Sequence, residues 1–208
     1  TTVPTTLEEA WTWDEFMANS RKIKQSDPDK YAFAYNWIEA GAYRWLNWLW
    51  QAGGTLLSED LQQVTLETPE GTKTMDLFRA WVDEGLIPAN NRPKGGRYPD
   101  ELFPSGIFSM VFTGNWLVPG FADQIKKFEF GVMPLPKDVA EATDLGGNAV
   151  TVPASTKNPA LAAKFAQYLA DEKSMRLFCE QAGTLPARVS LADADLDYAV
   201  RPDLMKIF

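Results

Sequence analysis

The hydrophobic pattern of the first fifty residues predicts helices that alternate with a short strand. Thr12-Trp13-Asp14-Glu15 is a capping box, and the apolar residues behind it recur at helical spacing, so we expect a helix over residues 13–25. Residues 31–36, YAFAYN, are short and aromatic and predict a strand. Residues 42–54, AYRWLNWLWQAGG, are apolar nearly all round before Gly-Gly, which predicts a fully buried helix with Trp45, Trp48 and Trp50 in the core.

The rest of the chain continues this alternation. Thr68-Pro69 predicts the start of a helix that ends at Gly85 and buries Met75, Phe78 and Val82. Further helices are expected over 116–127, where Pro119 would strain the helix, from Asn158-Pro159 with Leu161, Phe165 and Leu169 inward, and from Asp171 to Gly183 with Met175 and Phe178 inward. Strands are expected over 107–112, 128–136 and 148–153.

This order of elements predicts an α/β fold. In such folds helices flank a sheet, and ligands bind beyond the ends of the strands. With 208 residues, the chain is long enough for one large domain or two lobes.

Charge and hydropathy exclude several kinds of partner. The net charge is −8 and the isoelectric point is near 4.7, which leaves no basic surface for nucleic acid or anionic lipid. Arg92, Lys94 and Arg97 lie in a Gly/Pro-rich stretch that we interpret as a solvated loop. No apolar run is long enough to span a bilayer. The chain starts without Met or a leader, as expected of a mature or excised segment.

Few residues are available for catalysis or metal binding. The absence of histidine excludes Ser-His-Asp and Cys-His nucleophiles and the common catalytic zinc sites. Cys179 is expected to be a small buried hydrophobe. Asp193, Asp195 and Asp197 resemble the opening of a calcium loop, but its Gly and Glu positions hold Tyr198 and Leu204. The pairs Glu59-Asp60 and Asp83-Glu84 are interpreted as charged surface, so we expect no enzyme, metal or cofactor.

Aromatic and small polar residues gather where the predicted strands end. FPSGIFSMVFTGNW, residues 103–116, places Trp116 directly after the turn Thr113-Gly114-Asn115. The indole could cap the core or offer a flat platform to a sugar, whose ring faces carry C–H groups and whose rim carries hydroxyls. Tyr35-Asn36-Trp37 and Leu145-Gly146-Gly147-Asn148 have the same character, and the three ends could converge on one cleft.

The ordered set of these segments resembles a known family. TWDEF, WQAGG, FPSGIFSMVFTGNW, FGVMPLP, GGNAVTVPAS and PALAAKFAQYLADEKSMRLFCEQAGTLPAR, spread over about residues 10–190, are similar to the sugar-binding, maltose-binding-protein-like solute-binding proteins of ABC transporters. The resemblance implies a type II periplasmic-binding-protein fold, here an incomplete two-lobe middle portion of a longer protein. Residues 1–125 would belong to the second lobe, 126–185 would cross to the first, and 186–208 would return through the hinge, with one compact domain as the alternative.

The resemblance also implies a function and a site. The chain would be the extracytoplasmic component of a carbohydrate importer, periplasmic or lipid-anchored, monomeric, and recognised by ABC permease membrane subunits. It would bind a mono- or oligosaccharide and no nucleic acid. The alternatives are a carbohydrate-active hydrolase and a binding protein for peptides, polyamines or anions. The implied ligand-binding residues are Trp116, Asn115, Trp37, Asn36, Gly146, Gly147, Asn148 and Arg188.

Overall fold

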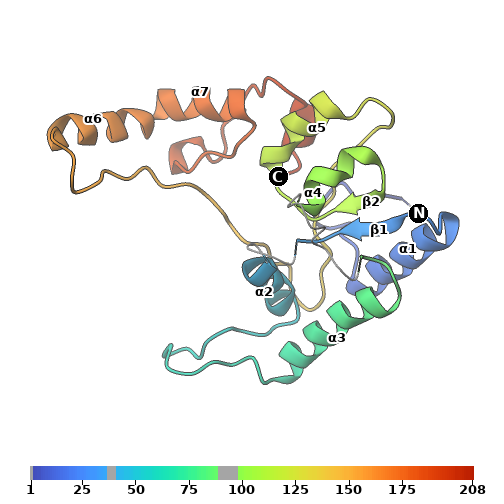
Figure 1. Cartoon of the computed structure of the whole chain (residues 1–208). Coiled ribbons are helices and arrows are strands. Elements are labelled where there is room, and N and C mark those ends of the chain that lie inside the picture. Colours follow the sequence, from blue (N-terminus) through green and yellow to red (C-terminus); the bar gives the residue numbers. More distant parts are fainter. Residues whose placement is uncertain (1, 37–40, 89–97) are drawn as a thin grey trace. The chain divides into compact units, whose positions relative to one another are not determined.

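The structure, a computed structural model, describes residues 2–36, 41–88 and 98–208 (Figure 1). The chain forms two compact units: unit 1 contains residues 1–113 and 127–144, and unit 2 contains residues 114–126 and 145–208. Each unit is therefore built from two separate stretches of chain. Within the described ranges no helix is both long and apolar enough to cross a bilayer.

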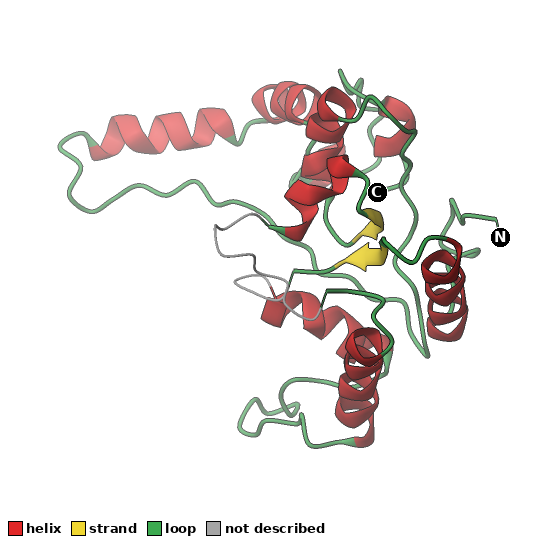
Figure 2. Ribbon diagram, turned by 45° about the vertical axis from the view of Figure 1, so that its right-hand side comes forward, coloured by secondary structure: helices red, strands yellow, loops and turns green. Residues whose placement is uncertain are grey.

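Unit 1 is built around a two-stranded parallel sheet (Figure 2). Its strands are β1 (Tyr31–Ala34) and β2 (Phe108–Val111), with Tyr31 opposite Phe108 and Phe33 opposite Met110. The helices of this unit are α1 (Trp13–Ser26), α2 (Gly41–Gln51), α3 (Pro69–Asp83) and the single turn α4 (Pro99–Leu102), followed by the 3-10 turn η1 (Phe103–Ser105). The strand predicted over 31–36 is confirmed for its first four residues, and the strand predicted over 107–112 is confirmed for its central four.

The predicted start of α1 is confirmed in atomic detail. The Thr12 hydroxyl accepts a hydrogen bond from the Glu15 amide at 3.2 Å, and the Glu15 carboxylate accepts one from the Thr12 amide at 2.8 Å. Two of the four amides that a helix leaves unpaired at its start are thus satisfied.

Aromatic rings form the core of unit 1. Phe33 lies in β1 and Tyr35 directly follows the strand, two positions on, so both side chains lie on the same face of the sheet. Trp81 of α3 is fully buried against both rings, at centroid distances of 5.0 Å from Phe33 and 5.4 Å from Tyr35. Trp48 of α2 lies 4.9 Å from Trp81. These contacts hold α2 and α3 on the face of the sheet that Phe33 and Tyr35 line.

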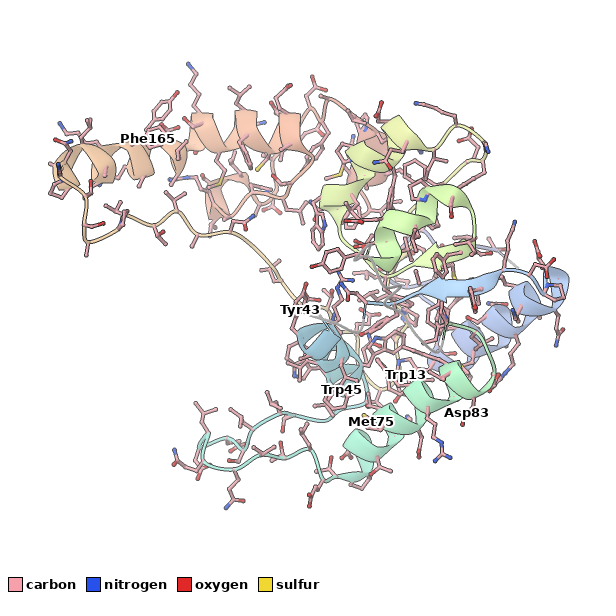
Figure 3. All side chains as sticks on the ribbon, viewed as in Figure 1. Trp13, Tyr43, Trp45, Met75, Asp83 and Phe165 are labelled. Atoms are coloured by element: carbon pink, nitrogen blue, oxygen red, sulfur yellow. The ribbon has the colours of Figure 1, made fainter. Side chains whose placement is uncertain are left out.

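The inward faces of α2 and α3 differ from the prediction. Trp48 is buried, but Trp50 is 36% exposed, so α2 is not buried on all sides. The α3 face turned to the core carries Thr74, Phe78 and Trp81, whereas Met75 is 57% exposed (Figure 3). Phe78 is buried as predicted, and Val82 is partly buried against the core. The prediction left out Trp81, whose large indole determines the packed face.

Unit 2 is largely helical. It contains the 3-10 turn η2 (Asn115–Leu117), α5 (Val118–Gln124), α6 (Pro159–Leu169), α7 (Glu172–Ala182), the 3-10 turn η3 (Val189–Leu191) and the short α8 (Pro202–Met205). Pro119 lies in the first turn of α5, where no helical partner is needed for its missing N–H, so the predicted strain is wrong. The Asp171 side chain caps α7, and Gly183 ends it with φ of +68°.

Two predicted strands are wrong. Residues 128–136 and 148–153 lie outside regular secondary structure. A strand exists only where a neighbouring strand pairs with its backbone. In the described part of the chain, the nearest pairing is an isolated bridge between Lys137 and Thr12, just beyond the first segment.

The apolar faces of α6 and α7 are open to solvent within unit 2. Phe165 is 59% and Phe178 is 64% exposed, and none of the α6 residues is buried (Figure 3 labels Phe165). The two helices are correctly predicted, whereas the burial of Leu161, Phe165, Leu169 and Phe178 is not observed. Cys179 of α7 is buried as predicted, at 2% exposure.

Candidate functional site

Trp116 lies in η2, directly after the turn that ends β2, and its side chain is 49% exposed. A β-carbon added to Gly114 would overlap three adjacent atoms of the six-membered indole ring, with Cζ3 the nearest and its neighbours Cε3 and Cη2 at almost equal distances. A point beyond the ring edge at Cζ3 would lie much farther from both neighbours, so the added atom lies over the ring face. The indole therefore rests flat on the Gly114 backbone and is not enclosed in the core.

Asn115 anchors the same turn to the end of α7. Its side-chain Nδ2 donates a hydrogen bond to the Gly183 carbonyl oxygen at 2.9 Å. Pro119 lies against the same point, since a β-carbon at Gly183 would approach its Cγ to 2.6 Å. These contacts all lie within unit 2, and they fix the backbone that carries Trp116. The Asn115 amide is thus engaged in holding the turn.

The glycine at position 114 gives a testable consequence. We expect Gly114→Ala to displace the Trp116 ring, because the added methyl group would overlap it. Keeping both groups in place would cost about 1–3 kcal/mol of overpacking, which movement of the indole relieves. The 19F resonance of 5-fluorotryptophan at position 116, assigned with Trp116→Phe, should shift. Gly120→Ala is the matched control, since its β-carbon would meet only Gln124 Nε2, at 3.8 Å. An unmoved resonance in Gly114→Ala would contradict the packing described here.

The other candidates occupy separate places. Gly146, Gly147 and Asn148 are exposed and lie outside regular structure, and a β-carbon at Gly147 would meet no atom within 4 Å. Arg188 is exposed and donates from Nη1 to the Ala170 carbonyl oxygen at 2.8 Å, at the C-terminal end of α6.

Asn36, at 4% exposure, follows β1 in unit 1, and Trp37 lies outside the described residues. The structure brings Trp116 and Asn115 together in one turn. The convergence of the remaining candidates on one cleft stays a prediction.

The sequence reasoning missed a buried polar stripe on α2. Arg44, Asn47 and Gln51 are 8%, 5% and 1% exposed, although they sit in a helix predicted as uniformly apolar. Their spacing of three and four residues places them on one helical face. This spacing was a signal available in the sequence, because polar residues at helical period within an aromatic helix must find buried partners.

Each member of the stripe has a backbone or side-chain partner in unit 1. Arg44 Nη1 donates to the Phe112 carbonyl oxygen at 2.9 Å, and Asn47 Nδ2 donates to Asp144 Oδ1 at 2.5 Å. Gln51 Nε2 donates to the Ala142 carbonyl oxygen at 2.9 Å. The Gln51 side-chain oxygen also accepts from Trp13 Nε1 at 2.8 Å.

These hydrogen bonds, with those below, hold the segment 137–144 against the rest of unit 1. The Ala140 amide donates to the Gln51 carbonyl oxygen at 3.0 Å, and Lys73 pairs with Asp138. The Lys137 amide donates to the Trp11 carbonyl oxygen at 2.8 Å, and the Trp13 amide donates to the Lys137 carbonyl oxygen at 2.9 Å. We call this segment the strap.

Glu84 and Asp60, one from each of the two carboxylate pairs considered above, do not have the raised pKa of a glycosidase acid. A general acid in such enzymes has a raised pKa. Arg21 donates two hydrogen bonds to Glu84, and this lowers the pKa of the Glu84 carboxyl. The Ser58 hydroxyl lowers the pKa of Asp60 in the same way. Among the described residues no three Asp, Glu or Cys side chains gather in a metal-binding group.

A shallow, largely apolar depression lies elsewhere in unit 1. It has a volume of about 990 Å³ and is lined by Trp45, by residues 66–69 and by the first two turns of α3 as far as Asp76. Figure 3 labels two of its lining residues, Trp45 on α2 and Met75 on α3. None of the residues singled out from the sequence as ligand-binding lines it, among those that the structure describes.

Comparison with known proteins defines the class. The profile of the bacterial extracellular solute-binding protein family matches residues 3–205, nearly the whole chain, and the chain therefore belongs to this family. The multiple sugar-binding protein of Streptococcus mutans is 26% identical over 204 residues, covering 92% of this chain and 48% of that protein. The chain spans about half the length of the curated relatives it matches.

Solved structures establish the fold. An ABC transporter solute-binding protein of Thermotoga lettingae, bound with α-D-tagatose, aligns with a TM-score of 0.73 and 24% identity over 88% of this chain and 48% of that chain. An ABC substrate-binding protein of Listeria monocytogenes, in complex with cycloalternan, aligns with a TM-score of 0.74 and 20% identity over 95% of this chain and 50% of its own. The expected fold, an incomplete periplasmic-binding-protein architecture, is confirmed. These relatives are named as binding proteins.

Proposed function

We propose that this chain is the sugar-binding portion of the extracytoplasmic substrate-binding component of a carbohydrate ABC importer. The observation that supports this most directly is the Trp116 indole, which lies flat on Gly114 and is 49% exposed. A core-capping tryptophan would be buried on both faces. An exposed ring on a fixed turn instead suits a saccharide, whose C–H faces stack on aromatic rings.

The chemistry of binding follows from this arrangement. One sugar ring would lie against Trp116, and Asn36 or Asn148 would bond hydroxyls at the rim. Each such hydrogen bond contributes about 1 kcal/mol net, since it replaces a hydrogen bond to water. Gly146 and Gly147 would let backbone amides approach the ligand without an obstructing β-carbon. The names of the relatives, a sugar-binding protein among them, support this ligand class.

Transport would depend on two lobes that close over the sugar. We propose the lobe assignment given above, with residues 1–125 in one lobe and 126–185 crossing to the other. Ligand shifts an equilibrium between open and closed forms only by its differential affinity for them. A sugar that contacts both lobes in the closed form alone would favour closure, and a membrane permease would recognise that form.

A ligand panel tests the proposal. We expect isothermal titration calorimetry on the native protein to detect saturable binding of at least one of maltose, maltotriose, cycloalternan and D-tagatose. Spermidine, a tripeptide and sulfate serve as controls for the other solute classes. Binding of one of these controls with no response to the sugars would overturn the sugar assignment. Release of reducing ends from the bound oligosaccharide would instead point to a hydrolase.

A further inference from the structure

Two neighbouring side chains on α2 hold the chain at two of the points where it leaves unit 1. Unit 1 ends at Thr113 before the first excursion into unit 2 and at Asp144 before the second. Arg44 bonds Phe112, one residue before the first exit, and Asn47 bonds Asp144 at the second. Arg44 and Asn47 lie three residues apart, so they share one face of the helix.

The first anchor completes the end of β2. The Phe112 amide donates to the Ala34 carbonyl oxygen at 3.1 Å, which extends the parallel pairing one residue beyond the strand. The Phe112 carbonyl oxygen accepts from Arg44, so both polar backbone groups of this residue are held. Thr113 then donates to Asp100 at 3.3 Å. Trp116 follows three residues after this fixed point.

Arg44 is an energetically costly donor for a backbone carbonyl group, because its charged side chain is buried. It is 8% exposed, and within the described ranges it makes one hydrogen bond and no ion pair. Burying a cation without a carboxylate costs free energy that an apolar helix residue would not incur. A long side chain that reaches the end of β2 provides what an apolar residue cannot, namely a hydrogen-bond donor for the Phe112 carbonyl oxygen.

The second anchor precedes the glycine loop. Asp144 is held by Asn47, and the strap before it is held by Gln51 through Ala140 and Ala142. Leu145, 93% exposed, comes next, and then Gly146 and Gly147. The chain therefore passes from a tightly bonded strap to an exposed, glycine-rich stretch within one residue.

We propose that Arg44 and Asn47 are positioning residues for sugar binding. Arg44 fixes the backbone of Phe112, four residues before Trp116, and Asn47 fixes Asp144, two residues before Gly146. This inference rests on the proposed function, because it assigns these two anchors to the residues that would contact the sugar. Neither anchor touches the ligand itself.

Hydrogen exchange and fluorine NMR test the anchors without any sugar. In Arg44→Met we expect at least fivefold faster exchange at the Phe112 amide and a shifted 19F resonance of 5-fluorotryptophan 116, because the strand end loses its donor. In Asn47→Leu the Ala140 amide should exchange faster and the Trp116 resonance should stay in place. Arg44→Lys, which keeps a donor, should restore most of the protection at Phe112.

A matched control separates positioning from general loss of stability. Thr74→Val replaces with a methyl group the hydroxyl of a residue that is 0% exposed, and the hydrogen bond lost, to the Glu70 carbonyl oxygen, lies within α3. This variant should not selectively raise the exchange rate of the Phe112 amide or of the Ala140 amide. If Thr74→Val and the two anchor variants raise exchange equally throughout unit 1, the anchors are only structural and the proposal fails.

Sugar affinity completes the test. With maltotriose as the probe, or the best ligand of the panel above, Arg44→Met and Asn47→Leu should each weaken binding about three- to fivefold. Faster local exchange with unchanged affinity would overturn the positioning role. If the unaltered protein binds none of the sugars, the proposed function fails, while the exchange and 19F results still decide whether the anchors fix the two segments.

Discussion

Trp116→Ala is expected to weaken saccharide binding by about tenfold or more, equivalent to about 1.4 kcal/mol, because the stacking face is lost. The free energy of unfolding should change by no more than about 1 kcal/mol, because a side chain that is 49% exposed contributes little to the core. Titration calorimetry and urea denaturation on the same preparations measure both quantities.

Trp50→Ala is the matched control for this result. Trp50 is 36% exposed, on the outer side of α2, and is not among the proposed ligand residues. It should leave affinity unchanged. The opposite pattern for Trp116→Ala, a large loss of stability with unaltered affinity, would return Trp116 to a packing role and remove the main support for the sugar site.

Trp81→Ala is expected to produce the largest loss of stability, about 3–5 kcal/mol. Trp81 is fully buried and lies within 6.4 Å, centroid to centroid, of the rings of Phe33, Trp48, Phe78 and three other aromatic residues. The remaining cavity would open between α3 and the sheet. With total stabilities of about 5–15 kcal/mol for ordinary domains, unit 1 would be close to unfolding at room temperature.

Two variants check the reason for that loss. Trp81→Phe should cost much less than alanine, because it keeps a ring and removes an indole N–H that is buried without a hydrogen-bond partner. Met75→Ala, on the exposed side of α3, should cost less than about 1 kcal/mol. If alanine at 75 and alanine at 81 shift the urea midpoint equally, the assignment of the packed face of α3 is wrong.

Local signals in the sequence were enough to locate most elements. Thr12, Thr68 and Asp171 each begin a helix by accepting a hydrogen bond from the amide three residues on, and Gly183 ends a helix in the left-handed conformation. Such caps depend little on the rest of the fold. Strand prediction succeeded where a partner exists, for β1 and β2, and failed over 128–136 and 148–153, because pairing is a property of two segments.

Burial was harder to predict than secondary structure. An apolar stripe indicates which face of a helix is suited to packing, but not whether another element packs against it. Phe165 and Phe178 were therefore predicted to point inward, whereas both are exposed. The candidate site shows the same limit. The exposed ring of Trp116 agrees with the platform interpretation, whereas its glycine seat and the Arg44 anchor depend on close approaches that no spacing in the sequence encodes.

The strap also sets an order of events during synthesis. β1 pairs with a strand more than seventy residues downstream, and the hydrogen-bond partners of the Asn47 and Gln51 side chains lie near residue 140. A growing chain emerges at about 5–20 residues per second, so for several seconds the aromatic core of unit 1 would lack its last segment. Chaperone capture in that interval, and aggregation when it fails, are the expected costs of assembling a unit from two distant stretches of polypeptide.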